Sequence, residues 1–200
     1  PGLLQSYEVE RKPIARRNIS FSTQNFNAWR DTPNPEAVCN ETPEGAAVRA
    51  AIGKRLRDST RVEWESMGLQ IGHRYEGSPI CVPDGTLPTP DDFREYIPTA
   101  RPGSRAPHAW LKDGRSTLDL FGSSFVLLCF EDRESEDSRA MAAAFSERKV
   151  PLETVFLNEP EIWALYGSKL VLVRPDGHVA WRGNRVETPG QIADTVRGAV

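Results

Sequence analysis

The second half of the chain alternates short apolar runs with amphipathic stretches, a pattern typical of an α/β domain. Residues 124–130 (SFVLLCF) are apolar almost throughout, which predicts a strand buried on both faces of a sheet. Residues 135–148 have helical spacing, with Met141, Ala144 and Phe145 predicted to face inward. The other predicted elements are strands at Thr117–Phe121, Leu152–Leu157, Leu170–Val173 and His178–Arg182, a short helix at Pro160–Tyr166, and a final helix after Thr188-Pro189 with Ile192 and Val196 inward.

The order of these elements indicates how they connect. Asp176-Gly177 is typical of a tight hairpin turn between the last two strands. One strand–helix–strand crossover, followed by an antiparallel hairpin and a closing helix, resembles the thioredoxin-like fold. We therefore expect an α/β fold class, with a thioredoxin-like C-terminal domain over residues 101–200 preceded by an extended helical segment.

The first thirty residues carry a helical pattern. Residues 3–30 predict a helix, in which Pro13 should introduce a kink or begin a second helix because proline cannot donate an intrahelical hydrogen bond. The apolar residues that recur near one face of this helix are Leu3, Tyr7, Ile14 and Phe21. We treat residues 1–31 as the first part of the chain.

Residues 32–100 form the second part, which combines a helix with a proline-rich connecting segment. Thr42-Pro43-Glu44 has the residue types of a helix start, and Gly68 is a natural stop for that helix. Residues 31–43 before it predict a loop. Residues 69–100 contain short extended pieces between prolines and should lie along a neighbouring surface, since a long loop without partners is unusual in a compact domain.

Composition narrows the functional classes. The 200 residues have a net charge of -3, and basic and acidic residues are mixed along the chain, which argues against nucleic acid as a partner. The three cysteines are too far apart in sequence for a zinc set or a disulfide framework, so we expect reduced thiols and a cytoplasmic location. No apolar run approaches the roughly 20 residues that span a bilayer, so we expect no membrane partner.

Thiol chemistry of the thioredoxin kind is not expected. The junction after the buried strand reads Glu131–Ser135 and lacks a Cys-x-x-Cys motif, and Cys129 lies within the strand as a core residue. Ser168-Lys169 stands where thioredoxins carry a cis-proline. No serine-nucleophile motif and no metal-ligand spacing occurs, and the sequence therefore assigns no catalytic, cofactor-binding or metal-binding residue.

Candidate contact residues lie in the turn-rich stretch Arg105, Pro107, His108 and Trp110. One interpretation is a hydrogen bond from His108 across to another domain or to a ligand. The plainer interpretation, which we favour, is a loop histidine that fixes the backbone. His73 and His178 lie in extended pieces, where surface positions are the default. The five tryptophans are spread along the chain and more often anchor cores and interfaces than bind a cofactor.

Several motifs, in order, resemble one enzyme family. They are similar to segments of group A FAD-dependent aromatic hydroxylases, which include phenol, dichlorophenol and polyketide hydroxylases. Ser6–Asn18 resembles the segment that closes their flavin domain. The other matching segments, from the connecting region and the thioredoxin-like domain, are Met67–Ile80, Tyr96–Leu111, Ser116–Gly122 and Val173–Gly183. Each motif alone is weak, and the specificity comes from their order.

The resemblance implies FAD reduced by NAD(P)H, which reacts with oxygen and hydroxylates an aromatic (phenolic or polyketide) substrate. The flavin-binding motifs of that family would lie before Pro1, since no Gly-x-Gly-x-x-Gly occurs here. We therefore expect a C-terminal portion that serves structure, domain packing and oligomerisation, that binds no cofactor alone and that is not catalytic in isolation. Its expected partners are an N-terminal flavin domain or other subunits of a homo-oligomer.

Two alternatives stay open. The chain could be a free-standing binding or dimerisation module, or a cofactor-free isomerase or lyase on the same scaffold. Residues 3–18 discriminate among the three, because the apolar face of their helix needs a flavin domain, residues 42–67 or another subunit to cover it. We prefer the hydroxylase portion, since Leu3 and Leu4 begin the helix without a capping residue.

Overall fold

A four-stranded mixed sheet forms the centre of the C-terminal unit in the computed structural model, which describes residues 2–31 and 35–199. Its strands are β1 (Phe125–Cys129), β2 (Leu152–Phe156), β3 (Leu170–Val173) and β4 (Val179–Gly183). The spatial order is β2-β1-β3-β4, with β1 parallel to β2 and the other neighbours antiparallel. These four strands and the thioredoxin-like architecture confirm the predicted fold class.

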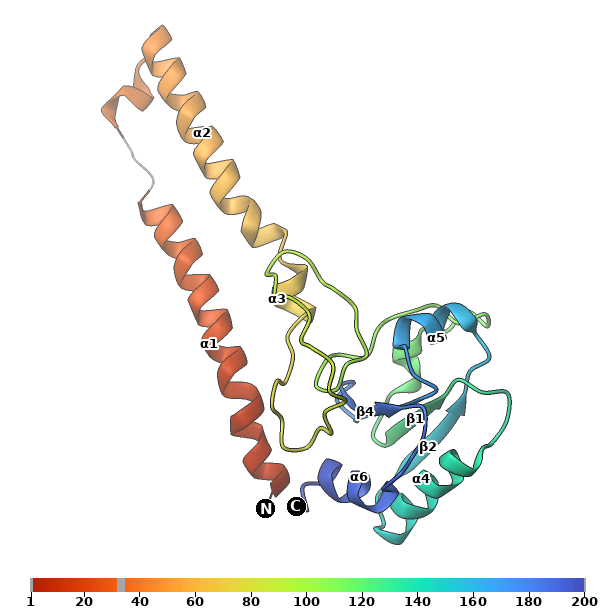
Figure 1. Ribbon diagram of the computed structural model, residues 1–200. Helices are drawn as coiled ribbons and strands as arrows, with labels where there is room; N and C mark the ends of the chain where they lie inside the picture. The colour runs from red at the N-terminus through yellow and green to blue at the C-terminus, as the bar shows by residue number, and fades with distance from the viewer. Residues whose placement is uncertain (1, 32–34, 200) are drawn as a thin grey trace.

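Helices cover both faces of the sheet (Figure 1). On one face, α4 (Glu136–Glu147) and α6 (Pro189–Val196) pack against a cluster that includes Leu127, Leu172 and Trp181. On the other face, α5 (Pro160–Tyr166) packs against a second cluster with Val126, Leu128 and Val171. The predicted inward residues of α4 and α6 are all buried: Met141, Ala144, Phe145, Ile192 and Val196.

One predicted strand is wrong. Residues 117–120 form a 3-10 helix, η2 (Thr117–Leu120), instead of a strand. The side chain of Ser116 accepts from the backbone N–H of Leu118, and the Asp119 carboxylate accepts from the N–H of Ser116 at 2.8 Å. These local hydrogen bonds satisfy the backbone at the start of the turn, so the segment needs no neighbouring strand.

A long helical hairpin precedes this unit (Figure 1). The helix α1 (Gly2–Arg30) is continuous through Pro13, so proline starts no second helix here. After the short η1 (Glu36–Cys39), α2 (Pro43–Trp64) returns alongside α1, and the Thr42 side chain accepts from the N–H of Gly45 as its predicted cap. We call α1, η1 and α2 the arm.

Gly68 does not end α2, contrary to the prediction. α2 ends at Trp64, and Gly68 lies inside the short helix α3 (Met67–Ile71). A Cβ on Gly68 would stand 1.9 Å from the carbonyl oxygen of Asp92 and 2.5 Å from that of Glu95. Glycine is needed at this position because another stretch of backbone approaches closely.

The proline-rich segment lies along the edge of the sheet, as predicted. The N–H of Val82 donates to the carbonyl of Ala180 in β4 at 2.8 Å, and the N–H of Tyr75 donates to Gly103 at 2.9 Å. The segment therefore fills the space between the arm and β4 (Figure 1).

The first turn of α1 lies beside the turn that follows α6. A Cβ on Gly198 would be only 2.4 Å from the backbone nitrogen of Leu3, and both ends of the chain lie together in Figure 1. Among the helices that the structure describes, none is long and apolar enough to cross a lipid bilayer.

Candidate functional site

A buried ion pair joins α1 to the hairpin between β3 and β4. The Arg174 guanidinium donates to both carboxylate oxygens of Glu10, Nη1 to Oε1 at 2.5 Å and Nη2 to Oε2 at 3.1 Å. Both residues are buried, with 5% of Glu10 and 8% of Arg174 exposed. The Ser78 hydroxyl also donates to Glu10 Oε1 at 2.6 Å, and Arg174 Nη2 donates to Asp176 at 2.8 Å. Four residues from three separate stretches of chain thus share one polar cluster.

The charges of this cluster shift the pKa values of Arg174 and Asp176. Burial disfavours the charged form of Arg174, but the hydrogen bond to Glu10 and the charge of Asp176 leave the pKa of Arg174 raised. For Asp176, burial is outweighed by His178 and Arg174, which lower its pKa to about 2. Burial raises the pKa of the nearby Cys81 thiol. Arg174 and Asp176 therefore stay ionised as a pair at neutral pH, and the Cys81 thiol is a weak nucleophile.

Aromatic rings pack beside the ion pair. Tyr75 stacks on His178 with ring centroids 4.3 Å apart, and His73 lies 5.4 Å from His178. Arg174 also lies over the Tyr75 ring, 5.4 Å from its centroid. The surface position predicted for His178 is wrong, since only 5% of it is exposed, and His73 is half-buried. The reason is that the segment carrying Tyr75 covers the start of β4.

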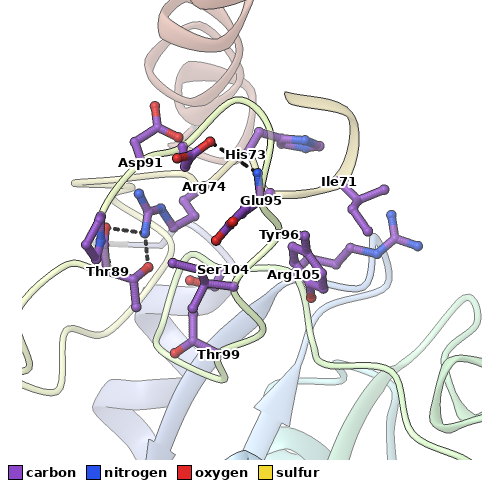
Figure 2. Close-up of a pocket in the computed structure, with 14 residues that line it drawn as sticks. Ile71, His73, Arg74, Thr89, Asp91, Glu95, Tyr96, Thr99, Ser104 and Arg105 are labelled. Carbon is purple, nitrogen blue, oxygen red and sulfur yellow. Dashed lines mark hydrogen bonds between the residues drawn. The ribbon is translucent and has the colours of Figure 1, made fainter. Parts of the chain in front are cut away.

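A small polar cavity opens next to these rings. Figure 2 shows Arg74 directed toward Thr89, whose carbonyl accepts its Nη1 at 2.6 Å. The lining also includes Glu95, Ser104 and Arg105, and the cavity volume is about 20 Å³. That volume has room for a single water molecule and excludes an organic substrate or a cofactor.

The four candidate contact residues do not converge on one point. Arg105 lines the small cavity and pairs with His178 through the backbone. The buried Pro107 offers its carbonyl to the Thr117 hydroxyl at 2.9 Å and to the Tyr166 hydroxyl at 2.7 Å. His108 and Trp110, by contrast, are both exposed.

His108 and Trp110 meet edge to face, with ring centroids 5.0 Å apart, and Trp110 is 69% exposed. In the part of the chain that the structure describes, neither reaches the buried cluster. The contact role proposed for these two residues stays a prediction.

The position that carries the dithiol in thioredoxins is acidic here. Cys129 is fully buried within β1, and burial with the nearby Glu131 raises its pKa to about 12. Residues 131–135 at the start of α4 hold three further charged side chains and no cysteine. Among residues 2–31 and 35–199, no group of histidine, cysteine or carboxylate side chains is arranged to hold a metal ion. The junction therefore lacks the dithiol on which thioredoxin chemistry depends.

Glu10 and Arg174 were missed by reasoning from the sequence alone. Each lies inside a segment singled out for its resemblance, Glu10 in residues 6–18 and Arg174 in residues 173–183. A glutamate on the inward stripe of a helix, four residues before Ile14 and eleven before Phe21, was the available signal. Pairing over 164 positions could not be inferred from that spacing.

Comparison with known proteins places these features in a family. Residues 99–199 match the family described as aromatic-ring hydroxylase, C-terminal. The chain belongs to this family. The match spans the thioredoxin-like unit, and similarity to whole proteins extends through the arm.

Curated relatives are monooxygenases. The chain is 34% identical to the FAD-dependent monooxygenase apdD of Emericella nidulans, over 94% of this chain and 32% of that protein. It is 30% identical to phenol 2-monooxygenase of a Pseudomonas species, over 96% of this chain and 37% of that protein. The chain thus spans about a third of the length of these relatives.

Solved structures resemble the whole chain. The rebeccamycin biosynthetic enzyme RebC with reduced flavin superposes with a TM-score of 0.88 at 43% identity, covering all of this chain and 37% of RebC. The flavin-dependent monooxygenase PieE, in complex with FAD and substrate, gives 0.72 at 27% identity. The arm and the thioredoxin-like unit together therefore correspond to a section of known flavoproteins.

Proposed function

We propose that this chain serves as the C-terminal part of an FAD- and NAD(P)H-dependent aromatic-ring hydroxylase. In this role it contributes domain packing and subunit contacts, while the flavin and the aromatic substrate are bound by other parts of the protein. The proposal rests on the family membership and on the flavoprotein relatives, which are about three times as long.

The structural observation that best supports the proposal is the set of exposed apolar side chains on α1. Its side chains Leu4, Ile19 and Phe26 are exposed by 83%, 66% and 64%, whereas the charged Glu10 on the inward face is buried. Ile19 and Phe26 also line one shallow hollow. An apolar helix surface of this kind needs cover, and a preceding flavin domain is the partner that the relatives suggest.

The described residues do not fit FAD by themselves. A pyrophosphate is usually held at a helix N-terminus that follows a glycine-rich turn. The start of α4, which follows β1 in this way, is flanked by the carboxylates of Glu131, Asp132 and Glu134 instead. Their negative charge repels phosphate, so the start of α4 is a poor site for the pyrophosphate of FAD.

The proposal is tested in chimeras that join this chain to the remaining two thirds of a relative. Residues 2–199 replace the matching C-terminal third of phenol 2-monooxygenase, and a second chimera uses RebC, which is 43% identical over the whole chain. We expect both chimeras to retain flavin at near one per chain and the first to oxidise NADPH in a phenol-dependent way. Matched chimeras with Ile19→Asp and Phe26→Asp should lose flavin, whereas Leu87→Asp, at an exposed loop position, should not.

The isolated chain provides the second measurement of this test. We expect it to stay colourless when titrated with FAD and to turn over no aromatic compound. Stoichiometric flavin binding by the isolated chain would contradict the proposal, and turnover by colourless protein would favour the cofactor-free enzyme. Chimeras that lack flavin while the isolated chain forms a stable dimer would favour the free-standing dimerisation module.

A further inference from the structure

We infer that Glu10 and Arg174 act as a latch that sets the position and register of α1 on the thioredoxin-like unit. Membership of the family does not by itself give either residue a function. The inference concerns two structural parts of the chain and the buried ion pair between them, and its test does not need flavin or substrate.

The first line of support is the scarcity of other ties. Within the described ranges, the side-chain hydrogen bonds from α1 to residues 101–199 are those of Glu10 with Arg174, and the first turn of α1 also packs against Gly198. Arg17 of α1 also forms an ion pair, with Asp91, and donates to the carbonyls of Gly68 and Leu69. Those partners belong to the connecting segment, so they tie α1 to the sheet only through that segment.

The second line is how fully the pair is satisfied. Both carboxylate oxygens of Glu10 accept from Arg174, and Ser78 supplies a third donor. Asp176 accepts a further hydrogen bond from Nη2 of the same guanidinium, and the Tyr75 ring lies against it. Because these contacts hold the guanidinium in place, its Nη1 and Nη2 donors to Glu10 point in one fixed direction.

The register of α1 on the thioredoxin-like unit is fixed because Arg174 is buried. A slip of α1 by one turn would bring Ser6 or Ile14 to the place of Glu10. Neither side chain carries a charge, so Arg174 would lose its partner while remaining buried, which is strongly unfavourable. A hydrophobic surface alone tolerates small shifts, whereas this pair allows one position. The latch therefore specifies how the arm is placed.

A consequence for the proposed function depends on that function being correct. If α1 continues a flavin domain, the latch would be the point where the thioredoxin-like unit is tied to that domain. Failure of the chimeras described above would remove this consequence and leave the latch itself untouched, because the latch is measured on the chain alone.

The test measures amide hydrogen exchange in Glu10→Gln, which keeps the shape of the side chain and removes its charge. We expect exchange in residues 2–16 to become at least about tenfold faster, with exchange in β1 and β3 unchanged. The matched control is Glu8→Gln on the same helix, where the exposed Glu8 pairs with Lys12 alone at 2.7 Å, and it should leave exchange unchanged.

A double variant separates a latch from general destabilisation. Glu10→Met with Arg174→Met removes both charges, so exchange in residues 2–16 should return to within about threefold of the native rate. The single variant Arg174→Met leaves Glu10 buried without its partner and should accelerate exchange as Glu10→Gln does. Equal acceleration in β1 and in α1, or no acceleration in any single variant, would overturn the inference.

Discussion

Every residue of β3 is buried, whereas α1, although 29 residues long, buries only Ser6, Glu10 and Phe21. α2 is barely buried at all, with Gly45 as its one buried residue among those described. The thioredoxin-like unit encloses its apolar side chains in two clusters around one sheet, while the arm leaves large apolar side chains such as Leu4 and Trp64 exposed.

The contrast separates two sources of stability. The unit is stabilised by burial of apolar surface, which is spread over many residues and depends little on any partner. The arm is held by a few polar contacts, mainly the pair of Glu10 with Arg174 and that of Arg17 with Asp91. Changes in the two regions should therefore differ in size and in kind.

The largest expected effect comes from the core of the unit. Phe145→Ala should lower the free energy of unfolding by about 3–5 kcal/mol, because the side chain is fully buried against Phe125 and its removal leaves a cavity. Phe26→Ala removes the same group from the arm, where it is 64% exposed, and should change stability by about 0.5 kcal/mol or less. Urea unfolding followed by circular dichroism measures both, and equal losses would contradict the contrast.

A smaller effect is expected on the free energy of unfolding at low pH. The pKa of Asp176 is lowered from 3.8 to about 2 in the folded chain, so the unfolded chain takes up the proton first as the pH falls. The stability that Asp176 contributes is complete above pH 3.8 and is lost as the pH falls through about 2. Asp176→Asn should therefore reduce the acid-dependent loss of unfolding free energy by about 1 kcal/mol, since solvent screens this partly exposed carboxylate.

Urea titrations at pH values between 6 and 2 measure this loss. Glu153→Gln, at an exposed position on β2, is the control and should leave the pH profile unchanged. An unaltered profile in Asp176→Asn would show that the hairpin carboxylate does not contribute to the acid sensitivity of the unit.

The smallest effect on stability is expected on the surface of the arm. Ile19→Asn with Phe26→Asn should change the free energy of unfolding by about 0.5 kcal/mol or less, since both side chains are exposed. The same change should reduce concentration-dependent association of the isolated chain, because it removes an apolar surface. Sedimentation velocity over a range of concentrations provides the measurement. Undiminished association would show that the chain associates through another surface.

The sheet and its helices were predictable because burial leaves a strong record in the sequence. Residues 124–130 and 170–173 are continuous apolar runs, and such runs have few alternatives to a buried strand. The 3-10 helix at Thr117 escaped prediction because its apolar residues alternate like a strand. Its conformation depends instead on hydrogen bonds made by Ser116 and Asp119.

The polar cluster could not be predicted, since its members come from distant stretches of the chain. Nothing near His178 in sequence indicates that Tyr75 will stack on it, because 103 positions separate the two rings. The apolar residues that helical spacing groups near one face of α1 are not covered alike: Phe21 is buried, whereas Leu3 and Tyr7 are 55% and 67% exposed. Helical spacing gives the faces of a helix, but the partners decide which face is covered.

The closeness of Gly2 and Gly198 has a practical use. A few glycine or serine residues would suffice to join these two ends into a ring, and the ring could be reopened at an exposed turn such as that around Gly114. Such a circular permutant would keep every element in place while moving the free ends to the exposed turn around Gly114.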